Sequence, residues 1–444
     1  MRATVKIRKR EADSVIKALE AGIVPQRGIQ HLLVGRSQEV HEVIQILEAV
    51  SKGESDFRIW VGDFGSGKSF MLQTIQSLAL QKNFVSSTLD LTPTRRFYAT
   101  DGKAVALYTA IIDGISTRLI QNGNALNTMI DEWLNKVMSE LAEKLQLPLS
   151  DFLEGKQNQA VENQILDLVM NFQAVGLGFE VGQVLTQYYH GIILNNRVLC
   201  LNAVRWLRGD IRTITESKAV LGINKIINDD NWYIALKTIT ELLLDIGYSG
   251  FVVNFDETVN LYKLPRSTTR ERNYEQILNI YNETKSNQAR GLFINFGATR
   301  KTVFDEYRGF SSYGALKGRL GLEDAMDSKL INTNRTTLPL KPLVPEEIYT
   351  LLTNLKLIFE VNYDLKLELP PQHIQSYMED QLNRPGADEF LTPRAVIKEF
   401  IEIMDLIRQN PNLAVEEILN EKFRDYQSPV TKDEADDDDV IEVF

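Results

Sequence analysis

The chain has 444 residues, of which 43% are hydrophobic and 25% are charged, a composition typical of soluble globular proteins with two or three domains. Its formal charge of −11 argues only weakly against nucleic acid as a partner, because seven acids lie in the last twelve residues and 49 basic residues otherwise face 53 acidic ones. A single cysteine, Cys200, excludes an intramolecular disulfide and a cysteine metal cluster.

The N-terminal part contains two helix signals. Residues 15–23 are amphipathic, and residues 39–50 have apolar side chains at helical spacing.

No apolar run approaches the roughly 18 residues needed to span a bilayer. Residues 1–11 are basic and polar, without the apolar region of a signal peptide. We therefore expect a cytoplasmic protein that does not enter a membrane.

Residues 62–69, Gly-Asp-Phe-Gly-Ser-Gly-Lys-Ser, fit the phosphate-binding P-loop pattern at every specified position. The apolar run 57–61 predicts a strand before this loop, and the spacing of residues 70–80 predicts a helix after it. The glycines let backbone N–H groups point at phosphate oxygens beside a helix N-terminus. Lys68 would then reach the β- and γ-phosphates of ATP, and the Ser69 hydroxyl would complete a Mg²⁺ shell.

A long helical segment follows the second strand candidate. Residues 84–91 alternate well enough for a strand, which Pro93 ends. Residues 101–247 then have apolar side chains at three- and four-residue spacing, and the next strand pattern comes only at residues 250–257. We therefore interpret residues 105–232 as a helical insertion into one α/β core.

Strand candidates at residues 291–297 and 336–340 complete the α/β part, and the alternation of strands with helices predicts a parallel sheet covered on both faces. The later pattern is helical and suits a small lid, and the proline- and acid-rich end is expected to be disordered. The predicted parts are an N-terminal segment with the first part of the core at 1–104, the insertion at 105–232, the second part of the core at 233–342, the lid at 343–426 and the acidic tail at 427–444.

Two adjacent carboxylates, Asp256 and Glu257, end the strand candidate at residues 250–257. This places them at the carboxyl edge of a parallel sheet, where ligands bind. Asp256 is the predicted Mg²⁺ ligand, and Glu257 is the predicted base that orients or deprotonates the attacking water. The alternative is an acidic pair that only begins a solvated loop.

Thr299 follows the strand candidate at residues 291–297. Its hydroxyl could lie between the base and the γ-phosphate and sense hydrolysis. Asn295 competes for this role, although its place inside the strand directs it elsewhere. The alternative for Thr299 is a helix cap.

Arg394 is a candidate contact to the γ-phosphate. Thr392 and Pro393 suit the start of a helix, so Arg394 falls in the first turn, where the helix dipole disfavours a cation. Such an arginine should have an anionic partner. The alternative to the phosphate is a salt bridge to a neighbour such as Glu389.

Arg319 lies downstream of Thr299, where an arginine could reach the nucleotide of a neighbouring subunit and stabilise transition-state charge. Arg300 and Arg308 compete for this role, and an intramolecular ion pair is the alternative. An arginine acting between subunits would require a homo-oligomer.

Two clusters mix cations with aromatic residues and are candidate nucleic-acid contacts. A solvated loop is the alternative for each. They are Arg95 and Arg96 beside Phe97 and Tyr98, and Lys263, Arg266, Arg270 and Arg272 after Tyr262.

The last residues join an acidic run, 436–439, to an apolar end at Phe444. This end resembles the acidic tips by which single-stranded DNA-binding proteins recruit partners, with charges that steer and a phenylalanine that fills a pocket. The alternative is a tail that only aids solubility.

Together the motifs resemble those of an AAA+ ATPase, and three short stretches resemble the BrxD-like ATP-binding proteins of bacterial BREX and related phage-defence loci over about residues 20–410. The three stretches are Trp206 to Asp210, Leu221 to Ile223 and Gly247 to Glu257. The nucleotide contacts that the motifs and this resemblance imply are Gly35, Arg36, Gly62, Asp63, Phe64, Gly65, Ser66, Gly67, Lys68, Ser69 and Phe70.

The resemblance implies an AAA+ core with a large helical insertion and a helical lid, which hydrolyses ATP with Mg²⁺ and remodels or loads partners on DNA. An Lhr-like helicase is an implied partner. A nucleotide-gated switch or scaffold with slow turnover is the first rival, and a small-molecule kinase is the second. Steady-state hydrolysis, measured with and without DNA, separates these functions.

Overall fold

The computed structural model describes residues 7–172, 176–321, 335–384 and 392–425. The chain divides into two compact units, Arg36–Pro342 and Met1–Gly35 with Leu343–Phe444. Within the described ranges, no helix is both long and apolar enough to cross a membrane. The predicted acidic tail and Glu389 lie outside the described residues.

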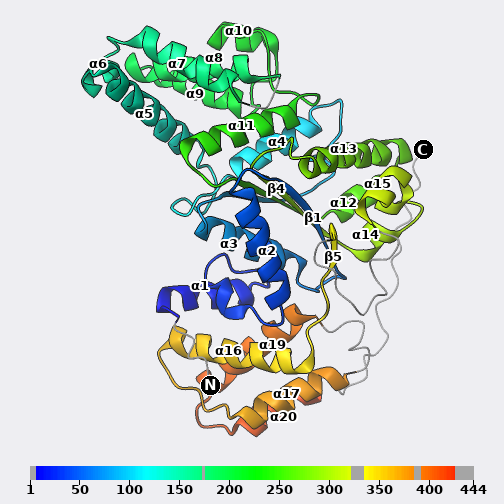
Figure 1. The fold of residues 1–444 in the computed structure, drawn as a ribbon. Coiled ribbons are helices and arrows are strands. Elements are labelled where there is room, and N and C mark those ends of the chain that lie inside the picture. The colour runs from blue at the N-terminus through cyan, green and yellow to red at the C-terminus, as the bar shows by residue number, and fades with distance from the viewer. Residues whose placement is uncertain (1–6, 173–175, 322–334, 385–391, 426–444) are drawn as a thin grey trace, which may run out of the picture. The chain divides into compact units, whose positions relative to one another are not determined.

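A five-stranded parallel sheet forms the centre of the larger unit (Figure 1). The strand order is β2-β3-β4-β1-β5, and all neighbouring pairs run parallel. Every strand lies at a strand candidate of the sequence analysis, which confirms the α/β class. The strands are β1 (Asp56–Val61), β2 (Val85–Asp90), β3 (Phe251–Asp256), β4 (Leu292–Ala298) and β5 (Thr337–Pro339).

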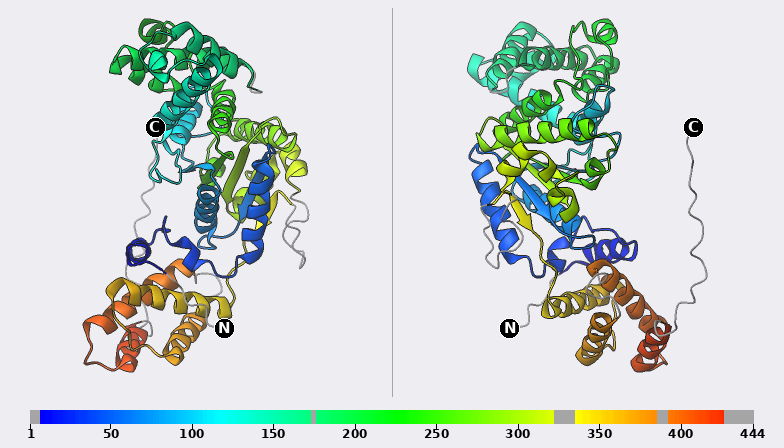
Figure 2. Two further views of the ribbon diagram at one scale, coloured as in Figure 1. Left: turned by 60° about the vertical axis from the view of Figure 1, so that its left-hand side comes forward. Right: turned by 90° about the vertical axis from the view of Figure 1, so that its right-hand side faces the viewer.

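Helices cover both faces of this sheet (Figure 2). They are α2 (Ser37–Val50), α3 (Lys68–Gln81), α4 (Lys103–Asp113), α11 (Trp232–Ile246), α12 (Val259–Tyr262), α13 (Ser267–Lys285), α14 (Arg300–Phe304), η2 (Phe310–Ser312) and α15 (Gly314–Leu320). Trp60, Val252 and Phe293 pack in one core with α2 and α3. Phe255 and Phe296 pack in the opposite core, which α4, α11 and α13 cover. Alternate strand residues point to opposite faces, so a sheet covered twice requires the near-continuous apolar runs seen in the sequence.

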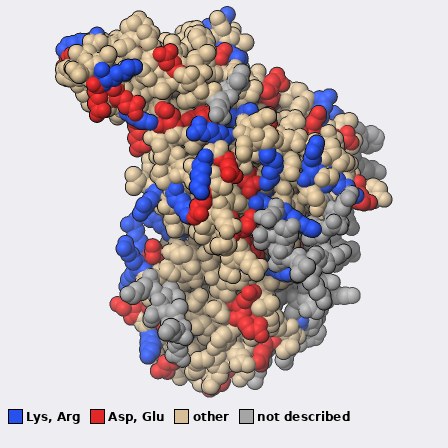
Figure 3. All heavy atoms as spheres, viewed as in Figure 1, with Lys and Arg blue, Asp and Glu red and all other residues tan. Residues whose placement is uncertain are grey.

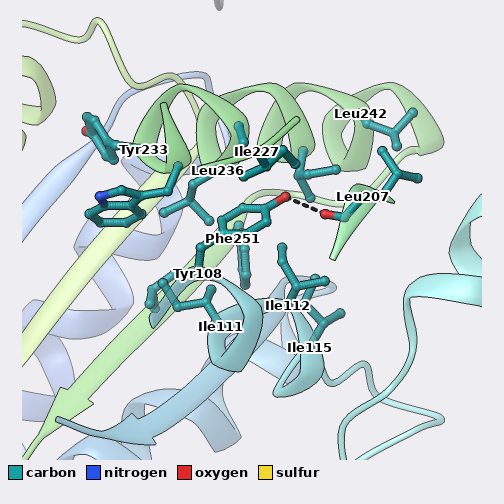
Figure 4. Close-up of a cluster of buried hydrophobic side chains, with 14 of the residues drawn as sticks. Tyr108, Ile111, Ile112, Ile115, Leu207, Ile227, Tyr233, Leu236, Leu242 and Phe251 are labelled. Atoms are coloured by element: carbon teal, nitrogen blue, oxygen red, sulfur yellow. Dashed lines mark hydrogen bonds between the residues drawn. The ribbon is translucent and has the colours of Figure 1, made fainter. Parts of the chain in front are cut away.

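Six further helices of the insertion lie beyond α4 and α11 at one end of this unit (Figure 1). They are α5 (Leu126–Leu145), α6 (Leu149–Leu153), α7 (Asn158–Met170), α8 (Gly178–Ile193), α9 (Arg197–Leu207) and α10 (Ile214–Leu221). Helix α4 packs on β2 and α11, so it covers the sheet. The predicted insertion began at residue 105 and therefore included most of this helix. The Tyr108 hydroxyl of α4 donates to the Leu207 carbonyl oxygen at 2.7 Å inside a shared apolar cluster (Figure 4).

The smaller unit is entirely helical within its described residues. Its helices are α1 (Lys9–Glu20), η1 (Ile29–Leu32), α16 (Pro345–Tyr363), α17 (Pro371–Asn383), α19 (Pro393–Gln409) and α20 (Val415–Asp425). Helix α1 buries Ala12, Val15 and Ile16 and packs on α16 and α19. The N-terminal segment therefore joins the C-terminal helices, whereas the sequence analysis grouped it with the first part of the core. The apolar face of α1 is the physical reason.

Candidate active site

The P-loop connects the end of β1 to the first turn of α3, as its motif predicts. Gly65 and Gly67 have φ values of +81° and +93°, which side chains with a Cβ rarely adopt. A Cβ on Gly62 would overlap the Ser66 Oγ, so the loop closes only on a glycine there. The Ser66 Oγ is buried without a hydrogen-bond partner among the described residues, an arrangement that a phosphate oxygen would satisfy.

Lys68 lies inside the loop that it is expected to serve. Its Nζ donates to the carbonyl oxygens of Gly62 and Asp63 at 3.0 and 2.7 Å and lies 5.5 Å from the centre of the Phe64 ring. The Phe64 side chain is 72% exposed. These contacts hold the ammonium group at the mouth of the glycine turn, where the β- and γ-phosphates of a nucleotide are expected.

Asp256 and Ser69 meet although 187 residues separate them. The Ser69 Oγ donates to Asp256 Oδ2 at 2.5 Å, and Asp256 is 8% exposed. A Cβ on Gly297 of the neighbouring strand would lie 2.8 Å from Asp256 Oδ1, so this glycine leaves room for the carboxylate. Hard oxygen donors of this kind are the ligands that Mg²⁺ prefers, and the pair fits the predicted metal site.

Glu257 combines an exposed side chain with a strained backbone. Its φ is +53°, in the left-handed region that a residue with a long side chain occupies at a cost. Its backbone N–H donates to Asp256 Oδ1 at 2.8 Å. The strain turns the chain sharply at the carboxyl end of β3 and exposes the Glu257 side chain at the edge of the sheet where the P-loop lies.

Thr299 caps the short helix α14, as the structural alternative predicted. Its Oγ1 accepts the N–H of Thr302 at 3.1 Å and hydrogen-bonds the Thr302 hydroxyl at 2.8 Å. The register pairs Ala298, the residue before it, with Val61 of the P-loop strand. Asn295 lies buried in β4 and accepts the indole N–H of Trp60 at 3.0 Å, so it is directed away from the site, as expected.

Arg36 supports the loop from outside. Its guanidinium donates to the carbonyl oxygens of Ser66 and Lys341 at 3.1 and 2.8 Å and forms an ion pair with Glu39, and only 7% of it is exposed. The sequence analysis named Arg36 as a nucleotide contact, but these bonds occupy it in positioning the P-loop. Phe70, also named, is half-buried in the first turn of α3.

A family model described as BREX system ATP-binding protein BrxC/D matches residues 7–423. The chain belongs to the BrxC/D family. The matched range contains the P-loop, Asp256, Glu257 and the helices of both units, and it confirms the resemblance to BrxD-like ATP-binding proteins. The description of the BrxC/D family supports ATP as the nucleotide of this P-loop. No curated protein matches the sequence significantly.

The structure of this BrxC/D protein separates the three candidate arginines near the sheet. Arg319 is exposed on α15 and forms no ion pair with any described residue. Arg308 donates to the carbonyl oxygens of Tyr262 and Leu264, which ties it down within the chain. Arg300 has a long contact of 3.7 Å with Asp63 of the P-loop. Arg319 is thus the candidate best able to contact another subunit.

Gly35 and Arg394 belong to the smaller unit. Gly35 has a φ of +68°, and a Cβ there would lie 2.5 Å from the Glu347 carboxyl group. Thr392 accepts the Ala395 N–H at 3.2 Å, so the predicted helix start before Arg394 is present. The Arg394 side chain is exposed and has no hydrogen-bond or ion-pair partner among the described residues. Its role at the γ-phosphate stays a prediction.

Asp90 is a neighbour of the site that the sequence analysis missed. It ends β2 and pairs in register with Asp256 of β3. Burial raises the pKa of Asp90, the charge of Asp256 raises it further, and Arg95 opposes both. The acidic end of the predicted strand was visible in the sequence, but only the strand order brings it beside Asp256.

Four of the predicted nucleic-acid residues fall on two loops of the larger unit, while Arg270 is buried in α13 and Arg272 of the same helix donates to the Tyr98 hydroxyl. Arg95, Lys263 and Arg266 are exposed, whereas Arg96 is largely covered and lies 3.9 Å from Asp101. The face drawn in Figure 3 carries Lys and Arg side chains interspersed with Asp and Glu rather than one continuous basic surface. A nucleic-acid contact would therefore have to be local.

Proposed function

We propose that this BrxC/D protein is an AAA+ ATPase that hydrolyses ATP with Mg²⁺ to remodel or load partners on DNA. The observation that carries the proposal is the hydrogen bond between Ser69 of the P-loop and Asp256, directly before the strained and exposed Glu257. One sheet edge thereby gathers phosphate-binding, metal-binding and base groups, which is what phosphoryl transfer to water requires.

Each group then has a distinct role in the proposed reaction. The loop N–H groups and Lys68 bind the β- and γ-phosphates. Ser69 and Asp256 would hold Mg²⁺, which neutralises charge on the phosphates when it is bound. Glu257 orients the attacking water and accepts its proton. The Thr299 hydroxyl, which hydrogen-bonds Thr302, would report on the γ-phosphate from the end of β4.

The strand order supports the AAA+ assignment. The acidic strand β3 is not adjacent to the P-loop strand β1, because β4 lies between them and presents Thr299 at its carboxyl end. The test is steady-state phosphate release by the purified protein with Mg²⁺, with and without DNA. Negligible turnover in both conditions would exclude the enzyme.

A nucleotide-gated scaffold is the second candidate, and the insertion favours it. Leu194, Val198 and Leu201 near the start of α9 are 70%, 66% and 59% exposed, which is a large apolar area for a helical surface. Such side chains suit contact with a partner protein. Slow turnover together with ATP-dependent assembly would support the scaffold over the enzyme.

Mixing two inactive variants is expected to show whether Arg319 acts on a neighbouring subunit. Arg319→Ala should lower hydrolysis by about 10³-fold or more if Arg319 stabilises the transition state. In a random mixture with Glu257→Gln, about a quarter of the interfaces would pair an intact Glu257 with an intact Arg319, so activity should return. A mixture as inactive as its components would place Arg319 outside catalysis between subunits. Arg300→Ala serves as the control arginine.

Removing the exposed cation of the β2 loop is expected to weaken DNA binding in a salt-dependent way. For each bond to a DNA phosphate that Arg95→Ala or Arg96→Ala removes, the slope of log affinity against log salt should fall by about 0.7 to 0.9. Arg95 should have the larger effect because it is exposed, while Arg96 is largely covered. Fluorescence anisotropy with single- and double-stranded DNA measures both slopes. Unchanged affinity and slope would remove this loop from the interface.

A further inference from the structure

The segments that follow β3 and β4 are joined into one surface, which we call the tyrosine platform: Tyr262, Lys263, Arg266, Lys301, Tyr307 and Arg308. Helices α12 and α14 contact each other there. The Tyr262 hydroxyl donates to Asp305 Oδ2 at 3.0 Å, and the Arg308 guanidinium donates to the Tyr262 carbonyl oxygen at 3.3 Å. Both segments are therefore fixed relative to each other.

Tyr307 is held outward from this surface. Its side chain is 89% exposed. The Asp305 Oδ1 accepts the backbone N–H groups of Tyr307 and Arg308 at 2.8 and 2.9 Å, so the loop that carries the ring is ordered. These backbone bonds, that of Arg308 first, hold the pKa of the Asp305 carboxyl below its usual range. The ring thus forms no part of the core, although its backbone is firmly placed.

Cations lie over the Tyr262 ring, whose hydroxyl faces the Asp305 carboxylate. Lys301 Nζ and the Arg308 guanidinium lie 5.7 and 5.4 Å from the centre of the Tyr262 ring. Lys263 and Arg266 are exposed and form no ion pair with any described residue. The exposed acid of the loop, Glu306, is paired with Lys317 at 3.1 Å and is thereby partly neutralised.

We propose that the tyrosine platform binds single-stranded nucleic acid, with a base stacked on the Tyr307 ring and phosphates on Lys263, Arg266 and Lys301. The exposed Tyr307 ring can stack on a base, and the cations of the Tyr262 segment and of α14 can bind phosphates, which are the two interactions that a single strand offers. A duplex hides its base faces and would use only the cations. A neighbouring copy of the chain is the other occupant that the test must separate.

The platform is joined directly to the proposed active site. Helix α12 begins at Val259, two residues after Glu257, and α14 begins at Arg300, the residue after Thr299. A nucleic-acid strand bound across both helices would therefore fix the two segments that carry the catalytic base, Glu257, and the candidate sensor, Thr299. This consequence rests on the proposed ATPase function, whereas the binding itself does not.

Fluorescence anisotropy with labelled oligo(dT) and oligo(rU) tests the platform on the full chain. Tyr307→Ala should raise Kd about 5- to 150-fold because one stacked base is lost, and Tyr307→Trp should retain binding. Lys301→Ala should lower the salt slope by about 0.7 on a single strand. If Tyr307→Ala raises the Kd equally for both oligonucleotides, the base stacks in DNA and RNA alike. If it raises the Kd for only one of them, the platform distinguishes deoxyribose from ribose. Phe179→Ala and Arg212→Ala, an exposed ring and an exposed cation on the insertion, should change nothing.

Three results would overturn the inference. The wild type would bind neither oligonucleotide, or the wild type and Tyr307→Ala would have equal Kd values, or the wild type would bind duplex more tightly than single strands. If Tyr307→Ala instead lowers the oligomeric mass in light scattering without changing Kd, the platform is a subunit interface. ATP binding by the wild type is measured in parallel with a fluorescent analogue. If the wild type binds ATP but neither oligonucleotide, only the platform is contradicted. If the wild type does not bind ATP, the proposed function is contradicted.

Discussion

Glu257→Gln is expected to lower the rate of ATP hydrolysis by about 10²- to 10⁴-fold, the usual contribution of a positioned general base. Glutamine has nearly the same shape but cannot accept the proton of the attacking water. ATP binding should persist because the P-loop contacts are untouched. Phosphate release under saturating ATP measures the first effect, and binding of a fluorescent ATP analogue measures the second. An unchanged turnover would contradict the assignment of Glu257 as the base.

Glu257→Gly separates catalysis from backbone strain at the same position. Glycine occupies a φ of +53° without the penalty that glutamate incurs there. The gain, offset by the greater freedom of the unfolded chain, should be about 0.5 to 1 kcal/mol and should raise the Tm by about 1 to 3 °C. Hydrolysis should be lost as in Glu257→Gln, which keeps the strain and the Tm. A lower Tm for the glycine variant would show that the Glu257 side chain stabilises the fold.

Lys68→Ala is expected to lower the stabilisation of the protein by ATP. At about 100 times the wild-type Kd, ATP should stabilise the wild type by about 2.7 kcal/mol, or about 4 to 8 °C in Tm. Loss of charge-assisted bonds to the phosphates should weaken binding about 10- to 150-fold, so about half to nine-tenths of that stabilisation should be lost. Differential scanning fluorimetry over a series of ATP concentrations with Mg²⁺ measures it.

The matched control is Lys82→Ala, at the other end of the same helix. Lys82 is paired with Glu48 at 3.2 Å on the surface and is not part of the P-loop. Its shift with ATP should equal that of the wild type. If ATP raises the Tm of Lys68→Ala as much as that of the wild type, Lys68 does not contact phosphate. Its bonds to the Gly62 and Asp63 carbonyl oxygens would then only shape the loop.

The sheet and the P-loop could be predicted because their signals are local. The run Phe251-Val252-Val253 puts apolar side chains on both faces of β3, and a strand that is covered on both faces accommodates that. The glycine pattern likewise specifies its own turn. The pairing of Asp256 with Ser69 follows once both motifs sit at the same sheet edge, which is why the centre of the site could be expected from the sequence.

Other features depend on contacts that no local pattern encodes. Asp90 lies beside Asp256 only because β2 and β3 are neighbours. Arg36 donates to two carbonyl oxygens of the larger unit and so positions the P-loop, a contact that its motif alone does not predict. The strained φ of Glu257 cannot be inferred from a residue type that usually avoids it. Tyr307 gave no signal because an exposed tyrosine in a loop is ordinary until its neighbours are known.

The insertion between β2 and β3 also sets the order in which the larger unit can form. The register of these strands joins Thr88 and Asn254, which are 166 residues apart in the chain. Closing so long a loop from an unfolded chain is slow, because its entropy must be lost before the strands pair. Helices α4 and α11 pack on each other and on the same apolar cluster, so a folded insertion holds its two ends together. We therefore expect the sheet edge that carries Asp90 and Asp256 to assemble only after the insertion has folded.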